Sequence, residues 1–467
     1  MKVSRFLLAA TPVLSLCCIA PVGNAALILT PMASGTAETS SVAPLVQGTD
    51  GNFYGSSFFG GSSNTGTIFK MTPNGAVTTL ALFDGTNGAN PVNGLIQGSD
   101  GNFYGSSFYG GIAYTNREGG YGTLFRMTPD GALTTLFWFN GTNGANPAGP
   151  LIQAADGNFY GTTAYGGSAG LGTIFELGTN GTLTTLFSFD GTNGAVPSQQ
   201  IVQMADKSLY GATYRGGPSD LGTIFRLAPE GSLTTLAWFN GANGAHPGSG
   251  LIQGSDGDLY GTTEEGGTNT AIIWNGVPGA GTLFRVRTNG ALVTLASFNT
   301  DNGAVPVGAL ALGADGNLFG TTQDGGTPHC HQGGPSGCGT VFQLSTNGAL
   351  TDLVAFNGVN GCQPVGGLML AADGNLYGTT FVNGVDGEVF RLTNAAAPVF
   401  QSVSQQGGLV TFTWTAILGQ TYELDYTTDF INWQNLNLLC NVPFSTMTNS
   451  ATVGSDMQRF YRVVLLP

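Results

Sequence analysis

Charged side chains are scarce in this sequence. Only 9% of the 467 residues are Asp, Glu, Lys or Arg, far below the share in an ordinary soluble domain. Heptads and long stretches with a 3.6-residue period are also absent, so little in the chain would form a solvated helical surface. The composition therefore favours strands and turns rich in Asn, Thr and Ser over a helical bundle or a coiled coil.

Basic side chains are the scarcer of the two charged kinds. The chain has 13 Lys and Arg residues against 27 Asp and Glu, a net charge of −14. Without Lys2 and Arg5, 11 basic residues face 27 acidic ones and the net charge is −16. Such a surface repels phosphate backbones, so we expect no nucleic-acid partner, whereas cations and neutral glycans remain suitable ligands.

Long hydrophobic runs are missing after the first 25 residues. Lys2 and Arg5 precede an apolar run over residues 6–20, and Gly23-Asn24-Ala25 offers a small-x-small cleavage site. This pattern predicts a secretory signal peptide over residues 1–25. No later run is long enough to cross a bilayer as a helix, so we expect an exported protein, extracellular, periplasmic or at the cell surface.

Glycine, in contrast, is abundant at 76 residues, and it recurs in two phrases. The first phrase is Asp, usually Gly, then a hydrophobic pair and Gly, at intervals of 50 to 59 residues. Its seven copies begin at Asp50, Asp100, Asp156, Asp206, Asp256, Asp315 and Asp373. The second phrase, Gly-Thr-(Ile/Leu/Val)-Phe, follows each of the first six copies, and Glu388 replaces its Thr in the seventh. A fixed period near 50 indicates one supersecondary unit stacked on copies of itself.

Residues 148–197 show the unit most clearly. Short apolar runs alternate with the hairpin turns Asp156-Gly157 and Asn180-Gly181, which predicts four antiparallel strands, the signature of a propeller blade. The fourth strand is missing from the seventh copy, and residues 27–30 could supply it and so close the ring without an unpaired edge. We predict a seven-bladed β-propeller over residues 26–396; an open solenoid is the alternative.

The two phrases resemble those of the tandem-repeat family named for Gloeobacter and Verrucomicrobia. The resemblance runs from about Leu45 to Leu392, with DGNFYGSSFFGG at Asp50, DGNFYGTTAYGG at Asp156 and DGNLYGTTFVNG at Asp373. It implies an exported protein at or outside the cell surface. It implies no catalytic residue.

The repeat period stops before the last 70 residues. Residues 409–414, 422–426 and 460–464 alternate in character like strands, with Trp414 and Trp433 as candidate core aromatics. We predict a small β-sandwich over residues 397–467. It resembles the fibronectin-like appendage of exported bacterial proteins, which implies adhesion or anchoring.

The predicted propeller has one plain face and one elaborated face. The first-to-second and third-to-fourth connections are tight turns, whereas the second-to-third connections carry inserts in repeats two, five and six. Loops on a rigid scaffold usually carry binding sites. The insert residues that could contact a glycan or a peptide are Tyr114, Arg117, Glu118, Tyr121 and Trp274.

Cysteine and histidine are too few for most catalytic constellations. Cys330 and Cys338 lie in one insert, and export favours a disulfide between them. The alternative is a zinc site made of His329, Cys330, His331 and Cys338, although that spacing is unusual. The pairing of Cys362 and Cys440 stays open.

Two further oxygen-rich patterns have ordinary structural explanations. The seven turn aspartates are expected to cap their own turns. The loops of the type Asp84-Gly85-Thr86-Asn87-Gly88 could hold calcium, but each offers at most one carboxylate. We therefore expect neither a metal nor another cofactor.

With three histidines in the chain, no Ser-His-Asp set can be proposed. We expect a non-enzymatic exported binding or surface-scaffold protein, with a glycan or an extracellular protein bound on the insert-bearing face. A polysaccharide hydrolase or lyase with carboxylates near the propeller axis is the alternative. The oligomeric state stays open.

Overall fold

The computed structural model consists of β-strands, turns and loops, without a helix in the residues it describes. Those residues are 3–9, 27–34, 43–112, 114–115, 118–197, 200–269, 277–326, 337–381, 387–394, 400–406, 409–415, 421–427, 434–439, 446–452 and 458–466. The chain divides into two compact units, Leu29–Arg391 and Met1–Ile28 with Leu392–Pro467. The predicted all-β class is confirmed.

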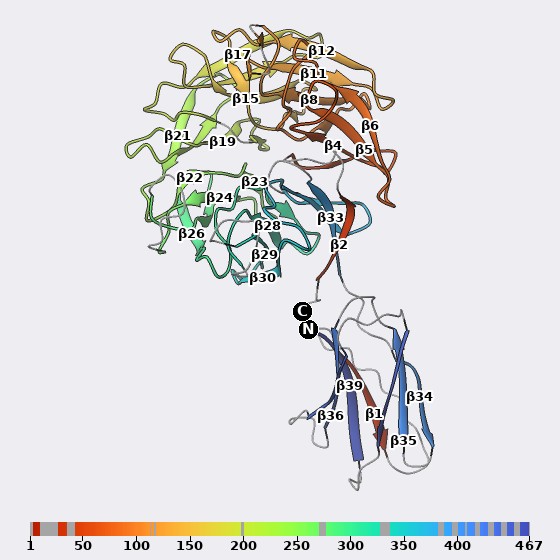
Figure 1. Cartoon of the computed structure of the whole chain (residues 1–467). Helices are drawn as coiled ribbons and strands as arrows, with labels where there is room; N and C mark the ends of the chain where they lie inside the picture. The colour runs from red at the N-terminus through yellow and green to blue at the C-terminus, as the bar shows by residue number, and fades with distance from the viewer. Residues whose placement is uncertain are drawn as a thin grey trace. The chain divides into compact units, whose positions relative to one another are not determined.

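Each repeat forms its own antiparallel sheet within the described part of the chain (Figure 1). Repeats one to three contain β3 (Val46–Gln47), β4 (Phe53–Ser57), β5 (Thr67–Met71) and β6 (Val77–Leu82); β7 (Ile96–Gln97), β8 (Phe103–Ser107), β11 (Thr123–Met127) and β12 (Leu133–Trp138); and β13 (Ala145–Pro147), β14 (Ile152–Gln153), β15 (Phe159–Tyr165), β16 (Thr173–Leu177) and β17 (Leu183–Ser188). Repeats four to six contain β18 (Val202–Gln203), β19 (Leu209–Thr213), β20 (Thr223–Leu227) and β21 (Leu233–Trp238); β22 (Ala245–Pro247), β23 (Ile252–Gln253), β24 (Leu259–Glu265), β25 (Thr282–Val286) and β26 (Leu292–Ser297); and β27 (Ala311–Leu312), β28 (Leu318–Thr322), β29 (Thr340–Leu344) and β30 (Leu350–Ala355).

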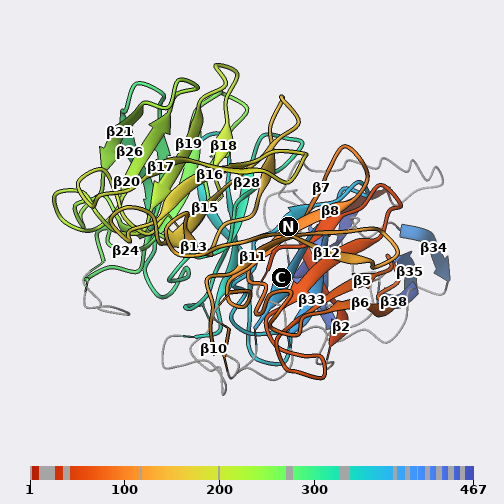
Figure 2. The same ribbon diagram turned by 90° about the horizontal axis from the view of Figure 1, so that it is seen from above.

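The seventh sheet takes its outer strand from the other end of the repeat region. It contains β31 (Met369–Leu370), β32 (Leu376–Thr380), β33 (Glu388–Asn394) and β2 (Leu27–Ser34), with β2 paired to β33. The two paired strands lie side by side in both views (Figure 1, Figure 2). The N-terminal segment therefore replaces the missing fourth strand, as its sequence predicted.

A recurrent hydrogen bond shows that the first and last repeats are neighbours. In repeats one to three, a turn amide donates to the glutamine Oε1 of the next repeat, as Thr49 N does to Gln97 at 2.8 Å. The same bond joins Ala372 N to Gln47 Oε1 at 2.8 Å. Residues of both repeats also share one buried cluster, in which the rings of Phe53 and Tyr377 lie 4.3 Å apart. The sheets thus form the closed array of a propeller.

Aromatic rings fill the space between adjacent sheets. The phenylalanine that begins each connection between repeats meets the phenylalanine of the next Gly-Thr-x-Phe phrase, with ring centroids 5.1 to 5.4 Å apart. Such contacts stabilise beyond simple burial by about 0.5–1.5 kcal/mol each. Gly261 shows why the repeated glycine is needed, because a Cβ atom there would lie 2.7 Å from Phe284 Cζ.

The second unit contains two antiparallel sheets. One has β34 (Phe400–Gln406), β35 (Leu409–Thr415) and β38 (Thr446–Thr452); the other has β36 (Thr421–Thr427), β37 (Gln434–Leu439), β39 (Gln458–Leu466) and β1 (Val3–Ala9). The rings of Phe412 and Tyr461, one from each sheet, lie 4.7 Å apart, and Trp414 is buried as predicted. Trp433 lies outside the described residues. The likeness to fibronectin domains and the cleavage of the segment that forms β1 stay predictions.

Candidate functional site in the axial cavity

The aspartates of the tight turns serve the turns themselves. Asp50 Oδ1 accepts a hydrogen bond from Asn52 N at 3.0 Å, and Asp50 Oδ2 accepts one from Tyr54 Oη at 2.9 Å. Burial alone would raise the pKa of Asp50, but the bonds from Asn52 and Tyr54 hold it below its ordinary value. The prediction that these residues are turn caps is confirmed by such bonds.

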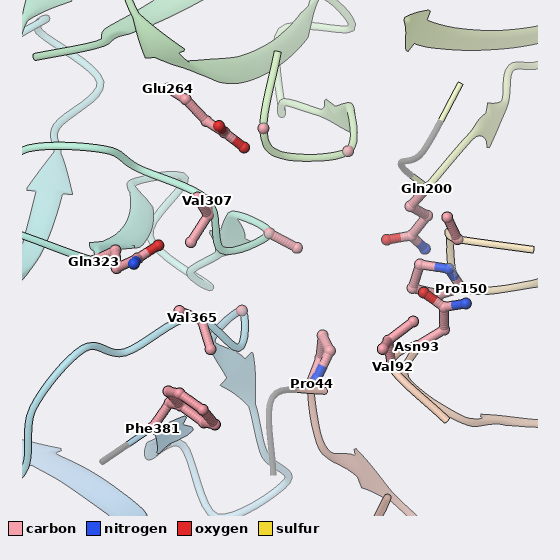
Figure 3. Close-up of a pocket in the computed structure, with 15 residues that line it drawn as sticks. Pro44, Val92, Asn93, Pro150, Gln200, Glu264, Val307, Gln323, Val365 and Phe381 are labelled. Carbon is pink, nitrogen blue, oxygen red and sulfur yellow. The ribbon is translucent and has the colours of Figure 1, made fainter. Parts of the chain in front are cut away.

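A cavity of about 430 Å³ lies where the seven repeats meet (Figure 3). Every repeat contributes to its wall, which is formed by Pro44, Val92, Asn93, Ala148, Pro150, Gln200, Gly248, Gly250, Glu264, Val307, Ala309, Gln323, Val365, Gly367 and Phe381. The contribution of all repeats places the cavity on the propeller axis. Its volume falls within the roughly 300–1,000 Å³ of small-molecule sites.

The cavity belongs to the face that carries the inserts. Its lining residues come from two places in the repeat: the approach to the first strand, such as Pro44 before β3, and the end of the second strand, such as Glu264 in β24. The end of the second strand is also where the second-to-third connection begins. A ligand in the cavity would therefore lie on the side where the sequence predicted binding.

Most of the wall is apolar, and four side chains supply its polar groups. Asn93 is already committed, because its Nδ2 donates to Ser106 Oγ and to Pro147 O, both at 2.9 Å. Gln200, Glu264 and Gln323 remain for a ligand. Glu264 is the only ionisable residue of the described lining, and in Figure 3 its carboxyl group points into the space that the other labelled side chains surround.

Glu264 occupies a position that is neutral in every other repeat. Glu264 is the third residue after the Gly that follows the hydrophobic pair. The residues at this position in the other repeats are Phe58, Phe108, Ala164, Tyr214, Gln323 and Phe381. Aligning the repeats could have revealed this exception from sequence. The prediction of insert residues overlooked it, because Glu264 lies inside a strand phrase rather than in a loop.

The neighbouring repeat holds the Glu264 carboxyl group in place. Tyr214 Oη, from the connection after β19, donates a hydrogen bond to Glu264 Oε2 at 3.0 Å. Burial raises the pKa of Glu264 to about 7; the Tyr214 hydrogen bond opposes this shift and the charge of Glu265 adds to it. Burial and the nearby Glu264 also raise the pKa of Tyr214, so its hydroxyl remains a donor.

A buried pair supports Tyr214 from behind. His246 Nδ1 lies 3.0 Å from Glu265 Oε2, and the two side chains are 6% and 0% exposed. The His246 ring stacks on Tyr214, with centroids 4.8 Å apart and planes 16° from parallel. Glu265 Oε1 is buried without a hydrogen-bond partner among the described residues. Tyr214, His246, Glu264 and Glu265 thus form one contiguous cluster at the cavity wall.

This arrangement can accept hydrogen bonds from hydroxyl or ammonium groups, and a carboxyl group with a pKa near 7 can also exchange a proton. The described lining contains no second carboxylate and no Lys or Arg. In the part of the chain that the structure describes, no group of three or more His, Cys, Asp or Glu could hold a metal ion.

The predicted insert residues lie apart from this lining. Tyr114 and Glu118 are on the hairpin of β9 (Tyr114–Thr115) and β10 (Glu118–Gly119), and Tyr121 is 38% exposed. Arg117 and Trp274 fall outside the described residues. None of the three described residues lines the axial cavity, and their contact with a ligand stays a prediction.

The cysteine predictions fall mostly outside the described residues. Cys338 is buried and disulfide-bonded, but Cys330, His329, His331 and Cys440 are not described, so the Cys330–Cys338 pairing and the zinc alternative stay predictions. The structure adds a neighbour that the sequence did not indicate. Cys362 Sγ lies 2.7 Å from Cys338 Sγ, and burial raises the pKa of the Cys362 thiol to about 11.

The loops proposed for calcium use their oxygens internally. Asp84 Oδ1 accepts hydrogen bonds from Thr86 N at 2.8 Å, Thr86 Oγ1 at 2.7 Å and Asn87 N at 3.0 Å. The equivalent loop at Asp190 has the same three bonds. These contacts account for the spacing that recurs in the loops of the different repeats.

No helix in the described part of the chain is long and apolar enough to span a membrane.

Several solved structures are distantly similar to the chain. A gluconolactonase from Xanthomonas campestris is 14% identical with a TM-score of 0.38, over 58% of this chain and 79% of its own. A putative 6-phosphogluconolactonase from Bacteroides uniformis is 13% identical with a TM-score of 0.42, over 84% and 96%. An ulvan lyase is 12% identical with a TM-score of 0.32, over 82% of each chain. Likeness at this level carries no activity to this chain.

No curated protein matches the sequence. The family model for the Gloeobacter/Verrucomicrobia repeat matches residues 40–274, 200–329 and 272–428. These matches cover all seven repeats, whose phrases, sheets and ring contacts are described above. The chain therefore belongs to the Gloeobacter/Verrucomicrobia repeat family.

Proposed function

We propose that this protein is an exported, non-enzymatic binding protein whose axial cavity takes the end of a glycan. The observation that carries the proposal is the single carboxyl group of Glu264, fixed by Tyr214 and directed into a cavity whose described lining holds no other charged side chain. Export rests on the N-terminal segment and on family membership.

The cavity has the mixture of groups that a sugar needs. A carboxylate accepts hydrogen bonds from sugar hydroxyls, and the amides of Gln200 and Gln323 can both donate and accept. The Pro, Val and Phe side chains of the wall suit the apolar C–H faces of a sugar ring. The inserts of the same face, including Tyr114 and Tyr121, would extend the contact beyond the cavity.

One observation favours the alternative of a polysaccharide-active enzyme. A partly buried carboxyl group with a pKa near 7 is suited to act as a general acid or base. Hydrolysis of glycosides ordinarily needs a second carboxylate on the other side of the scissile bond, and the described lining has none. Binding without turnover is therefore the better-supported function.

A glycan panel assayed for both binding and turnover tests the proposal. We expect at least one glycan to bind without being cleaved, and Glu264→Gln to weaken that binding at least tenfold. The substitution preserves shape, and glutamine already occupies the equivalent position in repeat six as Gln323. Glu230→Gln, in an exposed turn of repeat four, is the matched control and should bind like the parent protein.

Turnover of any glycan by the parent protein, lost in Glu264→Gln, would replace the proposal with the enzymatic alternative. Equal binding by the parent protein and Glu264→Gln would remove the axial cavity from the proposal. A panel without any bound glycan would overturn the glycan as the ligand.

A further inference from the structure

We infer that the ligand of the axial cavity carries a protonated amino group that pairs with Glu264, which makes an amino sugar the expected ligand class. This inference rests on the proposed function and makes it more specific, because a glycan site with a neutral or anionic preference would need different groups. It is carried by the charges around the cavity and by the geometry of Glu264.

The ionisable group of the described lining is a carboxyl group, and Arg215, next to Tyr214, lies outside that lining and pairs with Asp220 at 3.6 Å. Glu264 lines the wall, and Glu265 lies directly behind it with a side chain that is 0% exposed. The neighbouring basic group, His246, is already paired with Glu265 Oε2 at 3.0 Å. The described lining holds no Lys or Arg that could offset the Glu264 carboxyl group. A uronate or a sulfated sugar would therefore enter against a negative field, whereas a cation would be attracted.

The geometry leaves one oxygen of Glu264 for the ligand. Tyr214 Oη donates to Glu264 Oε2 at 3.0 Å, so Oε1 is the oxygen that this bond leaves for a ligand. In Figure 3 this carboxyl group faces the open space, with the amides of Gln200 and Gln323 also on the surrounding wall. One charged acceptor and two neutral amides match one ammonium group among several hydroxyls.

An ammonium group would also stabilise the ionised form of Glu264, which burial disfavours. Burial beside Glu265 disfavours the ionised form of Glu264, and this raises its pKa to about 7. A cation within hydrogen-bond distance favours that ionised form, and a charge-assisted hydrogen bond is about twice as strong as a neutral one. A hydroxyl ligand gains no such benefit, because it adds no positive charge.

Three β-1,4-linked trisaccharides that differ mainly at C2 test the inference: those of glucosamine, N-acetylglucosamine and glucose. A trimer of galacturonic acid adds an anionic ligand. Calorimetry at pH 6.5 suits the experiment, because an amine resembling an α-amino group, with a pKa of about 7.7–8.0, is then protonated. We expect the glucosamine trimer to bind at least tenfold more tightly than the other three.

Two further readouts identify Glu264 as the cause. Binding of the glucosamine trimer should release a proton at pH 6.5, measured in two buffers of different ionisation enthalpy, because Glu264 ionises when the amine arrives. In Glu264→Gln both the preference and the proton release should disappear, while Glu230→Gln should retain them. Thermal unfolding of each variant verifies that the fold is intact.

The outcomes separate this inference from the proposed function. Equal or tighter binding of the glucose or N-acetylglucosamine trimer contradicts the requirement for a protonated amino group and leaves a site for neutral glycans. Preference for the galacturonic acid trimer overturns the charge argument. A preference for the amine that persists in Glu264→Gln assigns it to another site and overturns the inference. If none of the trimers binds although the panel yields a neutral glycan, this inference alone fails.

Discussion

The connections that lead into repeats three and five have the same backbone and different chemistry. Asn146 and His246 occupy the same position, with φ of +55° in both. Asn146 Nδ2 donates to Phe108 O at 2.8 Å, a local bond between neutral groups. His246 instead contacts the buried Glu265 and stacks on Tyr214 beside the cavity.

The backbone contacts explain why the exchange is possible. Asn146 N donates to Tyr121 O at 2.7 Å, and His246 N donates to Leu221 O at 2.9 Å, so the two connections are held identically. The recurring Phe contacts between sheets are equally unaffected by the side chain at this position. The scaffold thus depends on its backbone and its aromatic core, while the side chains around the axis are free to diverge. In repeat five they include the lining carboxyl group of Glu264.

The largest expected difference between the two connections is the loss of stability when the side chain of His246 or of Asn146 is removed. In His246→Ala, Glu265 stays buried, its Oε2 loses its partner and its Oε1 already has none among the described residues, and breaking such a pair costs about 3–5 kcal/mol. Asn146→Ala shares with His246→Ala the backbone cost of alanine at a positive φ, and beyond that it loses one neutral hydrogen bond, at a cost of about 1 kcal/mol. Urea unfolding of both variants measures the difference.

A double variant provides the control for this prediction. His246→Asn with Glu265→Gln removes the charge and leaves two amides that can bond to each other, so it should recover most of the lost stability. Equal losses in His246→Ala and Asn146→Ala would mean that the pair in repeat five is no more important than the asparagine in repeat three.

The repeat phrases made the fold predictable, since turn residues and strand runs recur at fixed spacing. The use of residues 27–30 as the closing strand also followed from counting strands, because only the seventh repeat lacked a fourth. The axial site could not be predicted from the repeat phrases. Glu264, Tyr214 and His246 come from two repeats and from positions within regular phrases, and only the closed ring brings them together. The raised pKa of Glu264 depends on burial, which no spacing in the sequence indicates.

A second test concerns the pH dependence of stability, which should differ between repeats five and three. The folded protein holds the proton of Glu264 up to a pH of about 7, whereas the unfolded chain releases it near its ordinary pKa of 4.5. Between these values the folded state binds more protons, so this contribution to stability falls as pH rises from 4.5 to 7. The full effect is about 1–3 kcal/mol.

Unfolding free energies of the parent protein and of Glu264→Gln, measured from pH 4.5 to pH 8, isolate this contribution. The parent protein should lose stability relative to the variant as pH rises, and the curves should become parallel above pH 7. Repeat three has Ala164 at the equivalent position, so Ala164→Gln should leave the slope of the parent protein unchanged. Parallel curves throughout would contradict the assigned pKa.

The smallest expected effect sharpens the comparison at repeat four. Val196 occupies the position of Asn146 and His246 with φ of +55°, a conformation that strains a β-branched residue. Asparagine tolerates this conformation, and Asn90 and Asn146 each donate to a main-chain carbonyl of the preceding repeat from it, at 2.9 and 2.8 Å. Val196→Asn should therefore raise the free energy of unfolding by about 1 kcal/mol.

Val293, an exposed valine in β26, provides the control for this prediction. Its ordinary strand backbone favours valine, so Val293→Asn should lower stability slightly. Chemical denaturation measures the free energy of unfolding of both variants. If Val196→Asn lowers this free energy as Val293→Asn does, backbone strain at Val196 does not distinguish repeat four from repeats two and three.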